Sequence, residues 1–427
     1  MMISPTTLVD DNQRAMLSTY RVLDLTDEKG FYCGQLLGSL GADVIKIERP
    51  GGDSSRNIPP YYHDQSQPEL SLYWLAYNSN KRGITLNLQS HDGRRLFKRL
   101  IDKADVVLES APPGDMDKLG LGYSDLELIN PALVFTSITP FGQKGPYSGY
   151  KGPDLVCWAM GGLLAQTGDP DRPPVRISHI NFAYLIASMD AAWSTVMALY
   201  WRATSGKGQH IDVSIQESVA KTTFMEHEVW EVTGKQRERG SSFYKVPNSP
   251  ILLRVVWPVK DGYIYLMLRG GDLGARENPK IVQWMDDEGL ADEYIKSIKW
   301  SEVDWRNYTK EDVERIQGYF SRFFKTKTKS EILQGALERG IIIQAISSPR
   351  DIAEHPQLEA RGYWQEVEYP PPIDRITHPG RFIYPSASTC RIWRRAPLAG
   401  EHNREVYQGE LGISDAELSS LKEAGVI

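Results

Sequence analysis

Four glycines recur at intervals of three or four residues near the N-terminus: Gly30, Gly34, Gly38 and Gly41. Glycines at such a spacing could form the turn that holds the pyrophosphate of a dinucleotide. The G-x-G-x-x-G fingerprint of that turn is missing, however, and the turn carries Asp27 and Glu28, whose carboxylates would repel a pyrophosphate. The pattern therefore argues against a nicotinamide or flavin cofactor.

Other motifs that carry chemistry are absent from the sequence. It contains no G-x-x-x-x-G-K-[ST], no G-x-S-x-G and no H-E-x-x-H. The eight histidines form no pair at ligand spacing and the three cysteines form no C-x-x-C, so we expect neither a metal site nor a disulfide scaffold. Taken alone, His179 or His402 is more typical of a structural residue than of a catalyst.

The elements that must position any site begin with a β-α-β unit. Val22–Leu25 is typical of a short buried strand, Phe31–Leu40 of a helix stopped at Gly41, and Asp43–Ile47 of a second strand. Such a unit implies two parallel strands joined by a right-handed crossover.

The same alternation continues further along the chain. His91–Lys103 predicts an amphipathic helix, and Asp105–Glu109 and Leu133–Thr139 predict strands. Phe182–Ala203 predicts a long helix, and His210–Gln216 another strand. Alternating strands and helices favour an α/β domain built on a parallel sheet.

The regular hydrophobic periodicity of the sequence is lost near residues 235–250, which predicts a domain boundary there. Glu217–Thr233 predicts a helix, Gly234–Asn248 a loop, and Ile251–Val259 with Tyr263–Leu268 a hairpin closed by an Asp-Gly turn. Further helices are predicted at Lys280–Gly289, Glu311–Lys325, Ser330–Gly340 and Ser414–Gly425. The run Pro370–Pro372 predicts a linker.

Composition excludes several classes of protein. Of the 427 residues, 41% are hydrophobic and 24% charged, which is ordinary for a globular protein, and Lys+Arg minus Asp+Glu is 49 − 55 = −6. That balance argues against nucleic acid as a partner. The longest apolar runs, such as Gly340–Ile346, are too short to cross a bilayer, and no signal peptide is visible at the N-terminus. We therefore expect a cytoplasmic protein that does not bind membranes.

Several short segments occur in a fixed order along the chain: Leu23–Leu25, Gly41–Gly51, Asn80–Leu86, Asn130–Pro131, Ser137–Tyr147, Gly161–Gly168, Ser205–Gln209, Arg395–His402 and Glu423–Ile427. Together they resemble the class III coenzyme A-transferase family (CaiB/BaiF type), which includes formyl-CoA transferase, carnitine CoA-transferase and α-methylacyl-CoA racemase. The resemblance runs from about residue 20 to the C-terminus.

This resemblance implies an α/β fold. A large Rossmann-like CoA-binding domain would comprise residues 1–235 and 365–427, a smaller α+β domain residues 236–364, and two chains would interlock as linked rings. A CoA thioester and a carboxylic acid would be the substrates, with no permanently bound cofactor. The positions matching the family's nucleotide contacts are Arg49, Ser110 and Lys118. Cations at strand ends suit a phosphate-rich ligand in an acidic protein.

The reaction centre departs from the family pattern. The family's nucleophilic Asp attacks the thioester, and counting back from Ser205–Gly208 places Tyr184 at that position. Asp190 stands six residues later, about 9 Å along a helix and on another face. Pro153 replaces the racemase His, the loop Asp27–Phe31 is one residue shorter than usual, and the glycine-rich loop of formyl-CoA transferase has no counterpart.

Three functions remain open from the sequence. The first is a subunit of a hetero-oligomeric CoA-transferase whose Asp-bearing paralogous partner does the chemistry, an arrangement similar to that of benzylsuccinate CoA-transferase with succinyl-CoA as donor. In it Trp158, Phe182 and Tyr184 would suit an aromatic acid. The second is a self-sufficient, homodimeric acyl-CoA isomerase with Tyr184 or His179 as acid or base. The third is a protein that binds CoA esters without chemistry.

Overall fold

The computed structural model describes residues 15–177, 179–237 and 239–427. The chain divides into two compact units. The larger unit falls within Met1–Leu163, Ser178–Phe224 and Pro356–Ile427, and the smaller within Leu164–Ile177 and Met225–His355. Compared with the predicted boundaries, the smaller unit also takes in residues 164–177 and 225–235, and it ends before residue 356.

A parallel six-stranded sheet forms the centre of the larger unit, with the strand order β3-β2-β1-β4-β5-β6. Its strands are β1 (Arg21–Asp24), β2 (Asp43–Glu48), β3 (Lys81–Thr85), β4 (Val106–Glu109), β5 (Val134–Thr139) and β6 (Gln209–Ser214). This is the order of a Rossmann fold, in which the direction of winding reverses between β1 and β4. The predicted α/β class is confirmed.

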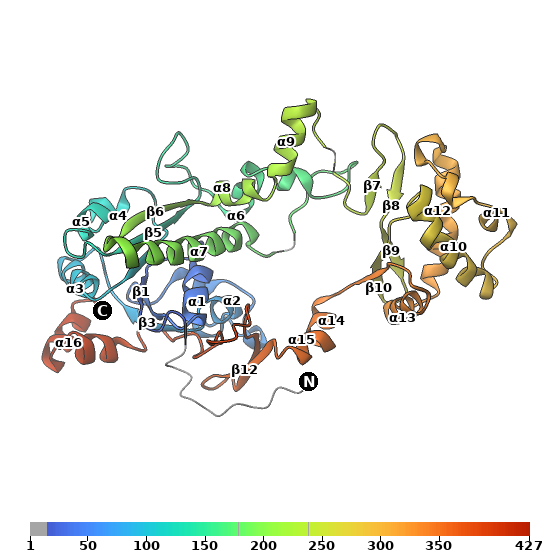
Figure 1. The fold of residues 1–427 in the computed structure, drawn as a ribbon. Helices are drawn as coiled ribbons and strands as arrows, with labels where there is room; N and C mark the ends of the chain where they lie inside the picture. Colours follow the sequence, from blue (N-terminus) through green and yellow to red (C-terminus); the bar gives the residue numbers. More distant parts are fainter. Residues whose placement is uncertain (1–14, 178, 238) are drawn as a thin grey trace. The chain divides into compact units, whose positions relative to one another are not determined.

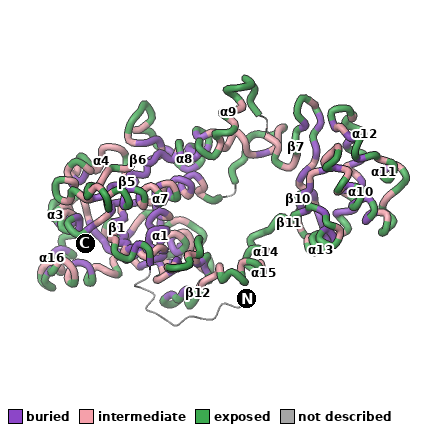
Figure 2. Tube along the Cα trace, viewed as in Figure 1, coloured by how far each residue is buried: buried purple, intermediate pink, exposed green. Residues whose placement is uncertain are grey.

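Helices cover both faces of this sheet (Figure 1). The helices of the larger unit are α1 (Phe31–Ser39), α2 (Leu72–Tyr77), α3 (His91–Ile101), α4 (Asp115–Lys118), α5 (Tyr123–Leu126), α6 (Asp154–Met160), α7 (Phe182–Ser205), α8 (Ile215–Lys221), α15 (Pro356–Ala360) and α16 (Asp415–Glu423). Successive residues of β5 show the layers: Phe135 packs in one core cluster with Leu96 of α3, whereas the hydroxyl of Thr136 lies 2.8 Å from that of Thr195 in α7. Because the central strands are covered on both faces, they are buried along their length (Figure 2).

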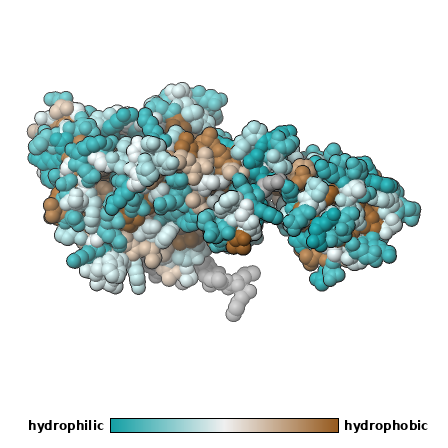
Figure 3. All heavy atoms as spheres, turned by 90° about the horizontal axis from the view of Figure 1, so that it is seen from above, coloured by the Kyte–Doolittle hydropathy of each residue, from teal (hydrophilic) through white to brown (hydrophobic). Residues whose placement is uncertain are grey.

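Helix α7 is the one described helix long and apolar enough to cross a bilayer, by length and composition alone. In this unit 56% of its most apolar stretch is buried, which is typical of a core helix. Other hydrophobic side chains of α7 are exposed, namely Trp193, Met197, Tyr200 and Trp201. Figure 3 shows hydrophobic residues among the hydrophilic surface of the larger unit.

The smaller unit contains a three-stranded antiparallel sheet of β9 (Val256–Val259), β10 (Gly262–Tyr265) and β11 (Gln344–Ile346). The other helices and strands between residues 224 and 355 are α9 (Phe224–Thr233), β7 (Phe243–Lys245), β8 (Leu252–Arg254), α10 (Gly271–Asp287), α11 (Glu293–Lys296), α12 (Lys310–Lys325), α13 (Lys329–Arg339) and α14 (Pro349–Ala353). Aromatic rings fill its core, where Trp257 meets Phe324 edge-on with ring centroids 5.6 Å apart.

Two predicted elements prove to be divided. The helix predicted over Glu217–Thr233 is two helices, α8 and α9, because the hydroxyls of Thr222 and Thr223 donate back to carbonyl oxygens three residues earlier. The strand predicted over Ile251–Val259 bends at Val255, so that β8 pairs with β7 and β9 pairs with β10.

Two other boundaries differ from prediction. The run Pro370–Pro372 is not a linker but part of the turn between β12 (Trp364–Glu368) and β13 (Arg375–Pro379), closed by a 2.9 Å hydrogen bond from Tyr369 N to Asp374 O. Proline has no N–H for a ladder, and a turn needs none. Helix α10 begins at Gly271, well before the predicted residue 280.

Candidate functional site

The carboxyl ends of β1 and β4 lie side by side where the strand order reverses. Doubly wound sheets bind ligands in the crevice outside such a switch point. Ser110, the first residue after β4, meets Asp27 of the loop after β1: the Asp27 N–H donates to Ser110 Oγ at 2.9 Å, and Ser110 Oγ donates to Asp27 Oδ1 at 2.8 Å. The hydroxyl keeps one lone pair, so Ser110 can only accept one further hydrogen bond there.

The two predicted cations lie after β2 and at the end of α4. Arg49 is exposed, its Nε donates to Gly52 O at 3.3 Å, and no carboxylate lies within 4.0 Å of it among the described residues. Lys118 is also exposed, but its Nζ lies 2.7 Å from Asp115 Oδ1. Arg49 can therefore contact a phosphate without giving up an ion pair, whereas Lys118 would exchange one. The assignment of Arg49, Ser110 and Lys118 to a nucleotide stays a prediction.

Tyr184, at the predicted position of the nucleophile, lies in the first turn of α7 and is buried. Its hydroxyl donates to Gly152 O at 3.2 Å, and its N–H donates to Asp154 Oδ1 at 3.2 Å. Burial raises the pKa of the Tyr184 phenol far above its ordinary value, and the facing groups Cys157, Glu28, Asp27 and Asp154 raise it further. This phenol stays protonated and cannot act as a nucleophile at neutral pH.

Asp190, the carboxylate nearest downstream on α7, is engaged elsewhere. It pairs with Lys221 of α8 and accepts a hydrogen bond from Trp193 Nε1 at 3.0 Å. Burial alone would raise the pKa of Asp190, but the hydrogen bonds from Lys221 and Trp193 bring it below its ordinary value. The ion pair with Lys221 thus engages the Asp190 carboxylate, which argues against Asp190 as a nucleophile.

The two histidines considered from the sequence differ in their surroundings. His402 bridges to β3, because its ring Nδ1 accepts from Gly83 N at 3.1 Å and its backbone N–H donates to Gly83 O at 2.8 Å. Burial lowers the pKa of the His402 imidazole. His179 is exposed just before α7. No group of three or more His, Cys, Asp or Glu side chains in the described part of the chain could hold a metal ion.

A cavity of about 410 Å³ opens beside the first turns of α7. Aromatic rings line it, and so does one guanidinium: Tyr32, Tyr77, Phe182, Phe382 and Arg381. Arg381 has no carboxylate within 4.0 Å among the described residues and stacks over Tyr384, 4.2 Å from the ring centroid. Of the aromatic residues predicted to face a substrate, Phe182 thus lines a cavity. Trp158 is fully buried and packs against Phe182, with the two ring centroids 5.5 Å apart.

Sequence reasoning missed two carboxyl groups near the switch point. Burial raises the pKa of Glu28, and the charge of Asp27 raises it further. Burial also raises the pKa of Glu109, at the end of β4, to about 7. Glu109 is 3% exposed, and the N–H of Ala111 donates to its Oε2 at 2.7 Å. A glutamate closing an apolar strand was the signal that could have found it.

A fully buried ionic cluster, also missed, fixes the loop after β1. Lys81 Nζ lies 2.8 Å from Asp24 Oδ2, and Lys46 Nζ lies 3.8 Å from Asp24 Oδ1. Lys46 donates to Thr26 O, and Lys81 donates to Phe31 O at 2.9 Å, so both ends of the loop are held. Lysines inside the apolar strands β2 and β3 were the visible signal.

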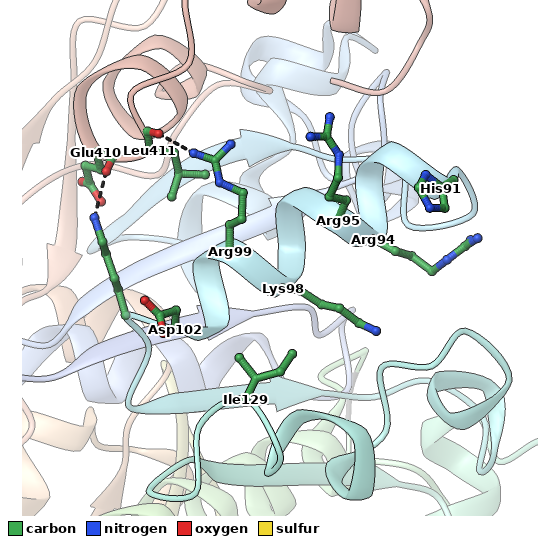
Figure 4. A pocket seen from close by; sticks show the side chains of 10 residues that line it. His91, Arg94, Arg95, Lys98, Arg99, Asp102, Ile129, Glu410 and Leu411 are labelled. Carbon is green, nitrogen blue, oxygen red and sulfur yellow. Dashed lines mark hydrogen bonds between the residues drawn. The ribbon is translucent and has the colours of Figure 1, made fainter.

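A second group of cations lies on α3, around a surface cavity of about 680 Å³ (Figure 4). Arg99 Nη2 donates to Leu411 O, and Lys103 Nζ donates to Glu410 O at 2.9 Å. These contacts tie α3 to the end of the π-helical turn Arg404–Glu410. The group thus fastens the C-terminal segment to the sheet.

The larger unit thus combines a Rossmann-type sheet, the unpaired Arg49 and the hydrogen-bonded pair Ser110 and Asp27 at the switch point. A family model, described as CoA-transferase family III, matches residues 17–403. This chain belongs to CoA-transferase family III. The resemblance inferred from the ordered segments is thereby confirmed.

Three relatives in the family cover nearly the whole chain. A succinyl-CoA:(R)-benzylsuccinate CoA-transferase subunit, BbsE, of Thauera aromatica is 33% identical, over 96% of this chain and 98% of the relative. A succinyl-CoA–D-citramalate CoA-transferase of Chloroflexus aurantiacus is 30% identical, over 96% and 98%. A formyl-CoA:oxalate CoA-transferase of Streptomyces coelicolor is 30% identical, over 96% and 99%. The protein is thus an enzyme of the CoA-transferase family.

A solved family structure has the same fold. A CAIB/BAIF family protein from Brucella suis superposes with a TM-score of 0.78 at 28% identity, over 93% of this chain and 100% of that chain. The family scaffold is therefore retained in this chain.

Proposed function

We propose that this chain is the subunit without the nucleophilic Asp in a hetero-oligomeric CoA-transferase. The observation that carries the proposal is the state of Tyr184: a buried phenol that donates to Gly152 O and whose pKa lies far above its ordinary value. Such a group cannot form the acyl anhydride that a carboxylate forms with a thioester. The chemistry then requires an Asp from a paralogous partner, in a heterodimer or heterotetramer.

The donor is succinyl-CoA, and the acceptor is an aromatic carboxylic acid similar to benzylsuccinate. Two observations support this choice. The relative from Thauera aromatica is named for that pair of substrates and is itself a subunit. The cavity beside α7 offers aromatic walls for a ring and the unpaired Arg381 for a carboxylate.

In this assembly the chain contributes architecture and CoA binding. Arg49 contacts a phosphate, Ser110 accepts from a donor group of the nucleotide, and Lys118 exchanges Asp115 for a phosphate. CoA thioesters are substrates, with no permanently bound cofactor, and the enzyme works in the cytoplasm without nucleic acid or membrane.

The decisive experiment is purification with and without an Asp-bearing paralogue, followed by a CoA-transfer assay with succinyl-CoA and benzylsuccinate. We expect the chain alone to transfer no CoA and to trap no aspartyl-CoA adduct, and the assembled complex to do both. Full transfer activity of the purified chain alone would overturn the proposal.

The acceptor is tested at Arg381. Replacing Arg381 by Met should raise the KM for benzylsuccinate by roughly ten- to a hundredfold, because a charge-assisted hydrogen bond contributes about 1.5–3 kcal/mol. The KM for succinyl-CoA should not change. Arg361→Met is the matched control, since Arg361 also lies over Tyr384 but outside this cavity. An unchanged KM for benzylsuccinate would move the acceptor elsewhere.

The isomerase alternative finds less support in the geometry. A general acid or base works best with a pKa near the working pH, and burial moves that of Tyr184 away from it. A CoA-ester-binding protein without chemistry would be indicated if the complex bound CoA but transferred none.

A further inference from the structure

Three polar side chains form a continuous row across β4, β5 and β6. Glu109 pairs with Ser137 in the register of β4 and β5, and His210, which pairs with Phe135 in the register of β5 and β6, reaches Ser137 diagonally. Ser137 Oγ lies 2.9 Å from His210 Nε2, and the Glu109 carboxyl group, on the neighbouring strand in register, is close enough for the Ser137 hydroxyl to lower its pKa. One hydroxyl therefore lies between an imidazole and a carboxyl.

The two ends of the row differ in their access to water. Glu109 and Ser137 are 3% and 2% exposed, whereas His210 is an exposed residue of the edge strand β6. The His210 ring stacks on Tyr123 with centroids 5.8 Å apart and meets Phe135 edge-on at 5.5 Å, which holds its Nε2 toward Ser137. The row thus leads from solvent to the switch point beneath Ser110.

Burial and the charges that face the two ends shift the pKa of both Glu109 and His210. Burial raises the pKa of Glu109 to about 7, with Asp27 raising and Lys29 lowering it from the loop after β1. Stacking desolvates the His210 ring and lowers its pKa, as does Lys144, against the opposing charges of Asp212 and Asp117. A raised pKa of Glu109 and a lowered pKa of His210 both favour the uncharged pair, a neutral carboxyl and a neutral imidazole.

We propose that Glu109, Ser137 and His210 form a proton relay, through which the carboxyl group at the switch point takes up a proton when an anionic CoA thioester binds there. The imidazolium Nε2–H passes its proton to Ser137 Oγ while the Ser137 O–H passes its own to the Glu109 carboxylate. This leaves a neutral imidazole and a neutral carboxyl, and an acid of the solvent, hydronium or buffer, then reprotonates His210.

The physical reason for the uptake is repulsion. An ionised Glu109, buried and next to Ser110 in the chain, would repel the phosphates and the acyl carboxylate of a succinyl-CoA bound at the switch point. Protonation removes that charge without moving the backbone that holds Ser110 and Asp27. Glu109 acts here as a positioning residue, and this role rests on the proposed function, because CoA must bind to this chain.

The first experiment needs no ligand. Histidine-labelled chain is titrated by NMR, and His210→Gln assigns the signal of His210 among the eight histidines. We expect the His210 titration to show two inflections, its own and that of Glu109, and to become single in Glu109→Gln. Glu28→Gln is the control, since Glu28 is a half-buried carboxyl whose pKa is also raised but which is not a neighbour of Ser137 in the sheet, and it should keep both inflections. Identical His210 curves in the parent chain and Glu109→Gln would overturn the relay.

The second experiment follows proton uptake by stopped-flow with a pH indicator when the assembled complex is mixed with CoA at pH 7. A group with pKa about 7 is half ionised there, so we expect uptake of up to about half a proton per CoA. Glu109→Gln should abolish the amplitude. Ser137→Ala should keep the amplitude and slow the proton uptake at least tenfold. This variant tests the relay even if Glu109→Gln does not fold.

The outcomes separate the relay from the function it serves. Full amplitude in Glu109→Gln, or an unchanged rate in Ser137→Ala, with CoA still bound, would overturn the relay. Absence of CoA binding to this chain in the complex would instead overturn the proposed function. The number of inflections in the His210 titration, compared between the parent chain and Glu109→Gln, would then test by itself whether the two groups are linked.

Discussion

Tyr184 offers one hydroxyl to its surroundings, and Tyr184→Phe removes that group while keeping the ring. The lost hydrogen bond to Gly152 O is between neutral groups and contributes about 1 kcal/mol. If the partner carries the nucleophile, we expect the kcat of the assembled complex to change by less than about tenfold. The isomerase alternative predicts a loss of about 10²–10⁴ in the same rate assay.

Tyr407→Phe is the matched control for this substitution. Tyr407 is also buried, and its hydroxyl donates to a carbonyl, Thr85 O, at 2.8 Å. Both variants should lose similar stability, so a difference in rate isolates the chemistry. A hundredfold loss of rate in Tyr184→Phe alone, with folding intact, would mean that Tyr184 of this chain takes part in the chemistry.

Arg49 carries the clearest prediction for CoA affinity. Its guanidinium has no carboxylate partner in the described structure, so Arg49→Ala removes a cation without breaking an ion pair. We expect the Kd for CoA to rise roughly ten- to a hundredfold, the equivalent of one charge-assisted phosphate contact of about 1.5–3 kcal/mol. Titration calorimetry measures it, with Arg404→Ala, an exposed arginine paired to Asp415, as control. A Kd within twofold of the parent would place the nucleotide elsewhere.

At the scale of elements, local patterns predicted the parallel sheet well. Val22–Leu25 and Asp43–Ile47 are apolar runs bounded by turns, and β1 and β2 lie within one residue of them. Strands buried on both faces depend little on distant partners for their pattern, so the sequence shows them. The break at Thr222 depends on hydroxyls competing for helix carbonyls, which periodicity does not show.

The candidate site was predictable where it follows from strand ends. Ser110, assigned to the nucleotide by the family resemblance, lies at the switch point because it follows β4, and its contact with a nucleotide stays a prediction. The row from Glu109 through Ser137 to His210 joins strands far apart in the sequence, and its existence depends on their order and register. The same holds for Lys81 against Asp24. Neither arrangement has a local signature.

The Glu109 carboxyl, at the end of β4, should make the free energy of unfolding depend on pH. In the unfolded chain Glu109 ionises near its ordinary pKa, whereas in the folded chain it stays protonated up to about pH 7. A raised folded-state pKa stabilises the fold below the unfolded pKa, and this contribution is lost as pH rises through about 7. The difference of about 2.5 pKa units corresponds to about 3 kcal/mol.

Glu109→Gln should remove this loss. We expect its urea midpoint to exceed that of the parent chain at pH 8 and the advantage to shrink toward pH 4. Glu423→Gln, an exposed carboxyl of α16, should show no such pH-dependent difference. Equal midpoints of the parent chain and Glu109→Gln at pH 8 would contradict the buried, protonated state.

At the scale of the whole molecule, α7 links the site to assembly. Its exposed side chains Trp193, Met197, Tyr200 and Trp201 follow one another at helical spacing and are 57%, 58%, 72% and 58% exposed. A soluble chain rarely leaves such a stripe uncovered, so it favours burial against another chain. The first turn of the same helix carries Tyr184, so a partner covering α7 would stand near the predicted position of the nucleophile.

We therefore predict that the chain is never a compact monomer. The linked rings that the family resemblance implies bury a permanent interface well above the ~1,600 Å² of ordinary complexes. Light scattering at micromolar concentration should give at least twice the chain mass of 48.2 kDa, with or without the paralogue. Trp201→Lys should lower the yield of the assembly, because it places a charge in an apolar interface. Val232→Lys, at an equally apolar exposed position on α9, should not. A monodisperse species at the mass of one chain would contradict both the linked rings and the role given to the stripe on α7.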